Sequence, residues 1–189
     1  MPKYQTNTIQ TLRNEHTTME YLLDKLEQQI ALFEKTEQPD YDFIIEVLDY
    51  FLIYPDLCHH PKEDLILRKL QARDPEAAES VPNLEIEHEK SSERLGKFSK
   101  AVTNILLEAE ISRQAFIDIA NQFIQGERAH MSMEENEFFP VALHCLSEKD
   151  WAEIDDKIDR FRDTLAADGK LRFGPLYKSI SAHQHFQAS

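Results

Sequence analysis

The chain has 189 residues, 41% of them hydrophobic and 30% charged, which suits one domain with a well-buried core and is short for two. Asp and Glu number 35 against 21 Lys and Arg, so the formal net charge is −14 at pH 7. A surface this negative repels nucleic-acid phosphates and anionic lipid headgroups, so neither a nucleic acid nor a membrane is expected as a partner.

Four long segments carry inward-facing residues at helical spacing. In the first, the steps alternate between three and four residues, which is typical of one helix face packed in a bundle. Its members are Ile9, Leu12, His16, Met19, Leu23, Leu26, Ile30 and Phe33. The second segment contains Pro55 and Pro61, where we expect a kink or a short break. Its members are Ile44, Leu48, Phe51, Pro55, His59, Glu63, Ile66 and Leu70.

The third and fourth segments repeat this pattern. The third comprises Leu84, His88, Ser91, Leu95, Phe98, Val102 and Ile105. The fourth comprises Phe116, Ala120, Phe123, Glu127, His130, Glu134, Glu137 and Val141. Four long helices with short or moderate connections predict an all-α fold, an antiparallel up-down four-helix bundle.

An additional C-terminal helix and a tail follow the bundle. Ser147 and Asp150 are spaced as in a capping box, which predicts a helix over roughly residues 148–167. We therefore divide the chain into a bundle over residues 1–147 and a C-terminal helix and tail over residues 148–189, packed on the bundle or extending from it. Residues 173–177 are a candidate docking segment within the tail.

The remaining composition points to the compartment. Cys58 and Cys145 are too few for a disulfide framework and form no Cys-x-x-Cys pair. The first residues lack the apolar stretch of a signal peptide, and no apolar run is long enough for a membrane span. We expect a cytoplasmic protein with reduced cysteines.

Each of the four stripes is interrupted by a histidine, and two stripes add a glutamate one turn later. The i,i+4 spacing places both side chains on one helix face. A buried, unpaired carboxylate costs several kcal/mol, and no arginine lies on these inward faces nearby, so a cation is expected between them. The six candidate metal ligands are His16, His59, Glu63, His88, His130 and Glu134.

Such a histidine–carboxylate set suits iron or manganese best, with zinc as an alternative. Six ligands are too many for one ion with an open coordination position and about right for two. If each glutamate bridges both ions and each ion takes two histidines, an oxo or hydroxo bridge adds a fifth bond and leaves one position for a small molecule. Tyr50, Tyr54 and Glu127 are candidates for orienting the ligands or lying beside that position.

The motifs resemble those of the hemerythrin-like domain, the HHE cation-binding family, over about residues 5–145. They read Leu12-Arg13-Asn14-Glu15-His16, His59-His60-Pro61-Lys62-Glu63-Asp64, Glu87-His88, His130-Met131-Ser132-Met133-Glu134-Glu135 and Phe138-Phe139-Pro140. The resemblance implies a four-helix bundle that holds two non-haem iron ions bridged by carboxylates, with the same six residues as ligands. The oxygen carriers of the family have a further histidine where this chain has Ser92, so the set looks more like that of the stress-response and iron-sensing members.

The resemblance implies binding or sensing of dioxygen, nitric oxide, peroxide or iron itself. One alternative is a redox enzyme that reduces peroxide or nitric oxide, oxidises ferrous iron or repairs iron centres, although no flavin, haem or Cys-x-x-Cys motif supplies an electron route. A second is a ferritin-like bundle, because Glu85-x-x-His88 and Glu127-x-x-His130 have its Glu-x-x-His spacing. A third is an interaction module whose C-terminal helix and tail bind a partner. The sequence identifies no electron donor.

Two pairs of neighbouring residues compete for a ligand position. His60 adjoins His59 but lies only three residues before Glu63, unlike the spacing on the fourth segment, so we prefer His59. Glu135 competes with Glu134 in the same way. We expect Cys58 to be a small buried residue and His144 to be a packing or surface residue.

Overall fold

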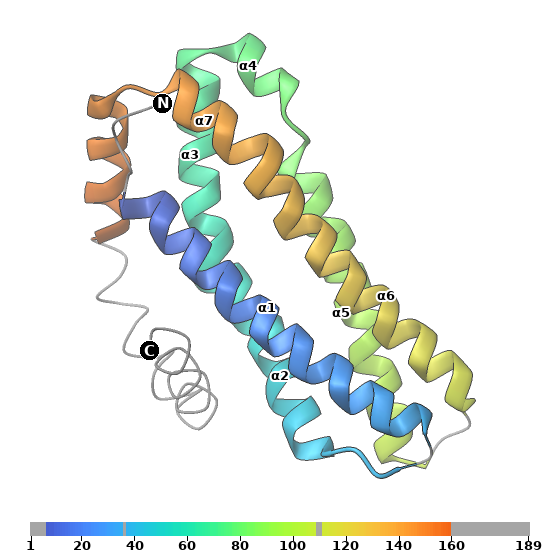
Figure 1. Ribbon diagram of the computed structural model, residues 1–189. Coiled ribbons are helices and arrows are strands. Elements are labelled where there is room, and N and C mark those ends of the chain that lie inside the picture. The colour runs from blue at the N-terminus through green and yellow to red at the C-terminus, as the bar shows by residue number, and fades with distance from the viewer. Residues whose placement is uncertain (1–6, 36, 109–110, 160–189) are drawn as a thin grey trace.

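The computed structural model describes residues 7–35, 37–108 and 111–159 (Figure 1). Its named elements are α1 (Asn7–Glu34), α2 (Tyr41–Tyr54), η1 (Pro55–His59), α3 (His60–Arg73), α4 (Pro75–Ser80), α5 (Leu84–Leu106), α6 (Arg113–Met133), η2 (Glu134–Phe138) and α7 (Phe139–Cys145). The two η elements are short π-helices, and residues 148–159 form a further helix. The prediction of an all-helical bundle is confirmed for this part of the chain.

Several of these elements join end to end into long rods. α2, η1 and α3 follow one another without a break, and so do α6, η2 and α7, so that they form two rods beside α1 and α5 (Figure 1). Asp40, Asn83 and Ser112 cap the starts of α2, α5 and α6, where each side chain accepts a hydrogen bond from the backbone N–H three residues on. The short helix α4 lies in the connection from α3 to α5 (Figure 1).

The apolar core consists of two clusters that lie one beyond the other along the rods. The lower cluster in the view of Figure 1 contains Leu26, Phe51, Phe98 and Phe123, among others. The upper cluster contains Leu12, Ile66, Phe138 and Trp151, among others. α1 and α5 begin in the upper cluster, whereas the α2–α3 and α6–α7 rods begin in the lower one.

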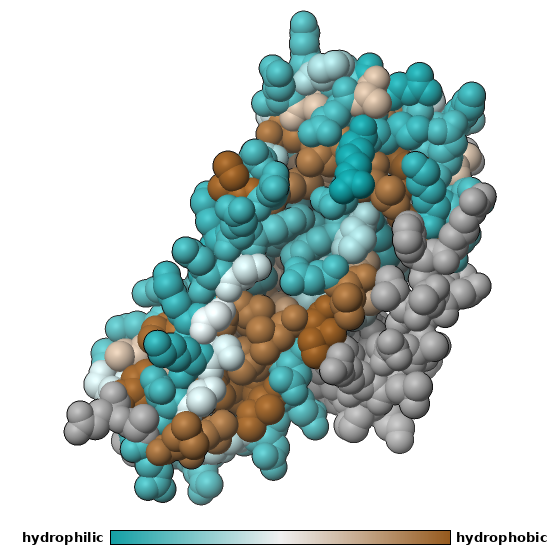
Figure 2. Space-filling model, turned by 180° about the vertical axis from the view of Figure 1, so that it is seen from behind, coloured by the Kyte–Doolittle hydropathy of each residue, from teal (hydrophilic) through white to brown (hydrophobic). Residues whose placement is uncertain are grey.

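The surface reflects this division. Figure 2 shows that apolar side chains gather over the lower half of the rear face and that hydrophilic side chains cross its middle.

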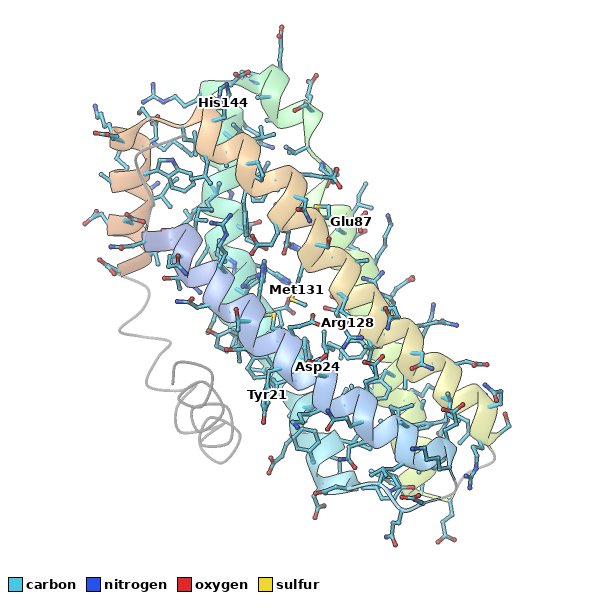
Figure 3. The ribbon with its side chains drawn as sticks, viewed as in Figure 1. Tyr21, Asp24, Glu87, Arg128, Met131 and His144 are labelled. Carbon is cyan, nitrogen blue, oxygen red and sulfur yellow. The ribbon has the colours of Figure 1, made fainter. Side chains whose placement is uncertain are left out.

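Across the bundle, the guanidinium group of Arg128 on α6 reaches α1, where it donates to Glu20, Asp24 and Glu27 (Figure 3). None of the described helices is both long and apolar enough to cross a membrane.

The helix over residues 148–159 packs on the upper cluster through Trp151, Ile154 and Ile158. It begins with the predicted capping box, since the backbone N–H of Ser147 donates to Asp150 and the backbone N–H of Asp150 donates to the Ser147 hydroxyl. The predicted end of this helix near residue 167 and the docking segment at 173–177 lie outside the described residues.

Candidate metal centre

The six predicted ligands lie in a polar layer between the two apolar clusters. On α1, His16 separates Leu12 of the upper cluster from Met19 of the lower one. On α5, His88 lies between Leu84 of the upper cluster and Phe98 of the lower one in the same way. All six residues are buried except His88, whose side chain is 16% exposed. The helical stripes therefore place these groups at one level of the bundle.

The first histidine group consists of His16 and His59. Their Nε2 atoms lie 3.1 Å apart. Oε2 of Glu134 lies 3.1 Å from Nε2 of His16, and Oε1 of Glu63 lies 3.3 Å from Nε2 of His59. Ligand atoms that bind one ion at about 2.1 Å are about 3 Å from one another, so these spacings fit a single ion among the four residues.

The second histidine group consists of His88 and His130. Oε2 of Glu63 lies 3.3 Å from Nε2 of His88, and Oε1 of Glu134 lies 3.0 Å from Nε2 of His130. Each of the two carboxylates therefore turns one oxygen toward the first group and the other oxygen toward the second. His60 was not among the preferred ligands, yet one of its ring nitrogens lies within 4.8 Å of a nitrogen of His88 and of His130.

Several atoms of this layer have no hydrogen-bond partner within the described part of the chain. They are both carboxylate oxygens of Glu63 and of Glu134, Nε2 of His88 and both ring nitrogens of His130. Buried polar atoms without partners are costly, and carboxylates most of all. Two cations, one at each histidine group, would satisfy the four carboxylate oxygens and Nε2 of His88 and of His130, so the donor set fits a pair of metal ions.

The pKa values of the residues in this layer also indicate that its two carboxylates attract positive charge. Burial raises the pKa of Glu63, but His59 and His88 outweigh this effect and lower it to about 2. Burial lowers the pKa of His59 and of His88. Glu63 and Glu15, with a smaller effect of Glu134, nevertheless raise the pKa of His59 to about 10, and Glu134 and Glu63 raise that of His88 to about 9. Without a metal, these imidazoles therefore hold protons at neutral pH, which an incoming cation must displace.

Two further carboxylates orient the first histidine group from outside. Glu15 accepts a hydrogen bond from Nδ1 of His59 at 2.9 Å and also binds Lys62 and the hydroxyl of Tyr54. Glu135 lies 3.0 Å from Nδ1 of His16 and is held by Arg13. Contacts of this kind fix the ring and leave Nε2 for a metal.

Sequence reasoning missed these outer roles. Glu15 entered it only as part of a motif, and Glu135 only as a competitor of Glu134. The signal that was present is adjacency, because Glu15 directly precedes His16, and Glu135 directly follows Glu134. Of the proposed tyrosines, Tyr54 acts through Glu15, while Tyr50 is buried and stacks on Tyr54.

The break expected at Pro55 and Pro61 takes the form of a π-turn, and a second π-turn that was not expected interrupts the α6–α7 rod. The backbone N–H of His60 donates to the carbonyl of Pro55, and that of Phe139 donates to the carbonyl of Glu134, so each hydrogen bond spans five residues instead of four. Such turns add one residue to a helix and are frequent at functional sites.

The second π-turn also corrects the expected inward face of the fourth segment. Glu137 and Val141 were expected to point inward, but Glu137 is exposed and Val141 is only half-buried. Phe138 and Ala142 are buried in their place. The extra residue of the π-turn shifts every later inward position by one.

The two Glu-x-x-His pairs are not brought into the polar layer as pairs. Glu85 is exposed, and Glu127 is buried but accepts a hydrogen bond from the Ser91 hydroxyl at 2.5 Å. Burial raises the pKa of Glu127, so it is a poorer source of negative charge than Glu63. Cys58 is half-buried, and burial raises the pKa of its thiol, which disfavours a thiolate ligand. The geometry gives no support to the ferritin-like alternative.

An open groove of about 970 Å³ lies between α3 and α5 and reaches the second histidine group. His88 lies in its wall together with Asp64, Arg68 and Ser92. The side chain of His59 in the first group, by contrast, is only 2% exposed. Solvent therefore approaches the polar layer from the side of His88.

Comparison with known proteins also points to cation binding. A family model described as the hemerythrin HHE cation-binding domain matches residues 7–142, which include all six predicted ligands. Searches of curated proteins and of solved structures found no match.

Proposed function

The chain belongs to the hemerythrin HHE cation-binding domain family, and from this premise we propose that it binds two iron ions and, at them, a small ligand such as dioxygen, nitric oxide or peroxide. The family implies binding of a metal cation, and the histidine–glutamate layer supplies residues that could hold it. In this proposal the α1, α2–α3, α5 and α6–α7 rods form an antiparallel up-down four-helix bundle around the ions.

One observation supports the proposal above the others: Glu63 and Glu134 each direct one oxygen toward the first histidine group and the other toward the second. Carboxylates in this position can bridge two ions, whereas a single ion would leave two of the four oxygens without a partner. We infer that His16 and His59 hold one ion, that His88 and His130 hold the other, and that Glu63 and Glu134 bridge them.

The bound ions would supply redox chemistry and an electrophilic position for a small ligand. The residues of the chain would hold the ions, orient the imidazoles and limit the access of water. The apolar clusters above and below the layer flank it along the bundle axis, and the groove beside His88 gives solvent one approach to it. A diatomic molecule or peroxide is small enough for such an approach.

The test is to reconstitute the full chain with ferrous iron without oxygen, remove the excess, and measure iron per chain by elemental analysis. We expect two irons per chain and a visible absorption band that develops on aeration. The matched variant is Glu63→Gln with Glu134→Gln, which keeps the side-chain volume but removes both bridging charges. It should retain less than one iron.

His144→Ala is the control, because His144 is exposed at the end of α7, well along the rod from Met131, the neighbour of His130 (Figure 3). It should bind two irons as the parent chain does. The proposal is wrong if the parent chain retains no iron, or if the double variant retains two.

A further inference from the structure

His60 has the arrangement of a ligand even though it directly follows His59. Its ring stacks on that of His88 with 3.7 Å between centroids and 18° between planes, and its centroid lies 6.2 Å from that of His130. One ring nitrogen from each of His60, His88 and His130 lies within 4.8 Å of the other two, so the three could bind the same ion. His60 therefore belongs, by position, to the second histidine group.

The other nitrogen of His60 is held by a carboxylate. Nδ1 of His60 lies 3.0 Å from Oδ1 of Asp56, one turn earlier in the same rod. Glu15 holds Nδ1 of His59, and Glu135 holds Nδ1 of His16, in the same manner. A carboxylate on Nδ1 fixes the ring and leaves Nε2 free for a metal, so all three rings share the contact typical of metal-binding histidines.

The π-turn at Pro55–His59 explains how two consecutive histidines reach the same layer. Neighbouring residues on a regular α-helix point about 100° apart, so an α-helix that directs His59 inward turns His60 toward its flank. Here the backbone N–H of His60 closes the five-residue hydrogen bond to Pro55. The wider turn lets His59 join the first group while His60, with a side chain only 15% exposed, joins the second.

We propose that His60 is a third histidine ligand of the second metal position, an inference that rests on the proposed function. The two positions then differ, with two histidines at the first and three at the second. In this proposal His60, on the α2–α3 rod, replaces the histidine that the oxygen carriers have on α5 at the position of Ser92.

The experiment is to titrate the metal-free full chain with cobalt(II), whose visible absorption reports its ligands, and to count bound ions by elemental analysis. The parent chain should bind two. His60→Gln should bind one cobalt as before and the second at least tenfold more weakly, with a change in the visible bands of the second only. His60→Glu, which has the same length but supplies a ligating oxygen, should bind both.

The outcomes separate this inference from the proposed function. A parent chain that binds fewer than two cobalt ions contradicts the proposed function. A parent chain and a His60→Gln variant that both bind two ions with equal affinity and spectra overturn only the role of His60. Far-UV circular dichroism of each metal-free variant checks folding, and His144→Ala is again the control for loss of an unrelated histidine.

Discussion

The two histidine groups of the polar layer are held in different ways. In the first, His16 and His59 are buried, and each has Nδ1 fixed by a carboxylate that is itself bound by a cation. In the second, Nδ1 of His130 meets no hydrogen-bond partner among the described residues, and His88 borders an open groove. Under the proposed function, the first position would be largely formed before an ion binds, whereas the second would be less constrained.

Removal of the metal should have the largest effect and should affect the groups unequally. At a free ion concentration 100 times the dissociation constant, each bound ion stabilises the fold by about 2.7 kcal/mol. Two ions then correspond to a rise in Tm of about 10 °C or more for a domain of this size. Calorimetry of the iron-loaded and chelator-treated chain measures this difference.

Hydrogen exchange on the same two samples sharpens the comparison. After chelation, amides of α5 around His88 should lose more protection than amides of α1 around His16, because only the latter region keeps its carboxylate anchor. Equal loss in both helices would contradict the idea that the first position is built in advance.

A smaller effect is expected from the outer carboxylates taken one at a time. Glu15→Gln keeps the shape of the side chain but removes the charge that orients His59, and changes of this kind typically weaken metal binding about 10- to 100-fold. Asp56→Asn is the matched variant for His60, but the Asp56 side chain is 70% exposed, so water replaces it readily. We expect less than a tenfold loss for Asp56→Asn.

Competition with a coloured chelator measures both affinities, and the Tm of each metal-free variant controls for folding. The affected ion also matters, since Glu15→Gln should weaken the first position and Asp56→Asn the second. Equal effects of the two substitutions would mean that burial of the anchor is irrelevant.

The smallest effect concerns Asp150, which provides a reference outside both histidine groups. Burial raises its pKa, but hydrogen bonds from Ser147 and the guanidinium of Arg73 outweigh this and lower it to about 2. Because the folded chain binds the proton less tightly than the unfolded one, this carboxylate stabilises the fold above about pH 4 and stops doing so as the pH falls through about 2.

Arg73 is half exposed, so solvent screens the pair and we expect Asp150→Asn to lower the free energy of unfolding by about 1 kcal/mol at pH 7. Urea unfolding of the metal-free chains between pH 7 and pH 3 measures this, and the difference between the two chains should shrink toward the acid end. A difference that grows on acidification would show that Asp150 does not act through its charge.

Helical periodicity was sufficient to predict most of the polar layer. Every member of the first stripe is buried, from Ile9 to Phe33, and His16 lies among them as expected. The same reasoning brought Glu63 and Glu134 to the centre, because i,i+4 spacing from a histidine holds whether or not the helix deviates a few residues later. The family model matches the part of the chain in which these stripes lie.

The inward positions beyond each π-turn could not be predicted from a regular 3.6-residue period, because the helix there departs from α-helical geometry. This departure was present in the sequence as runs of four-residue steps, at 55, 59 and 63 and again at 130, 134, 138 and 142. Such a run drifts off one face of an α-helix unless an extra residue is absorbed. Glu137 and Val141 were misplaced for this reason, and the outer carboxylates Glu15 and Glu135 were missed because the packing of other rods brings them to the rings.

The prolines that follow the two π-turns affect whether each turn can move along its helix. The extra residue of a π-turn can move along a helix when neighbouring backbone N–H groups change their carbonyl acceptors one after another. Pro61 and Pro140 have no N–H to take part in that exchange. Each proline therefore prevents the π-turn before it from moving toward the C-terminus. The wide turns beside His60 and Glu134 should therefore keep their place when the cations depart.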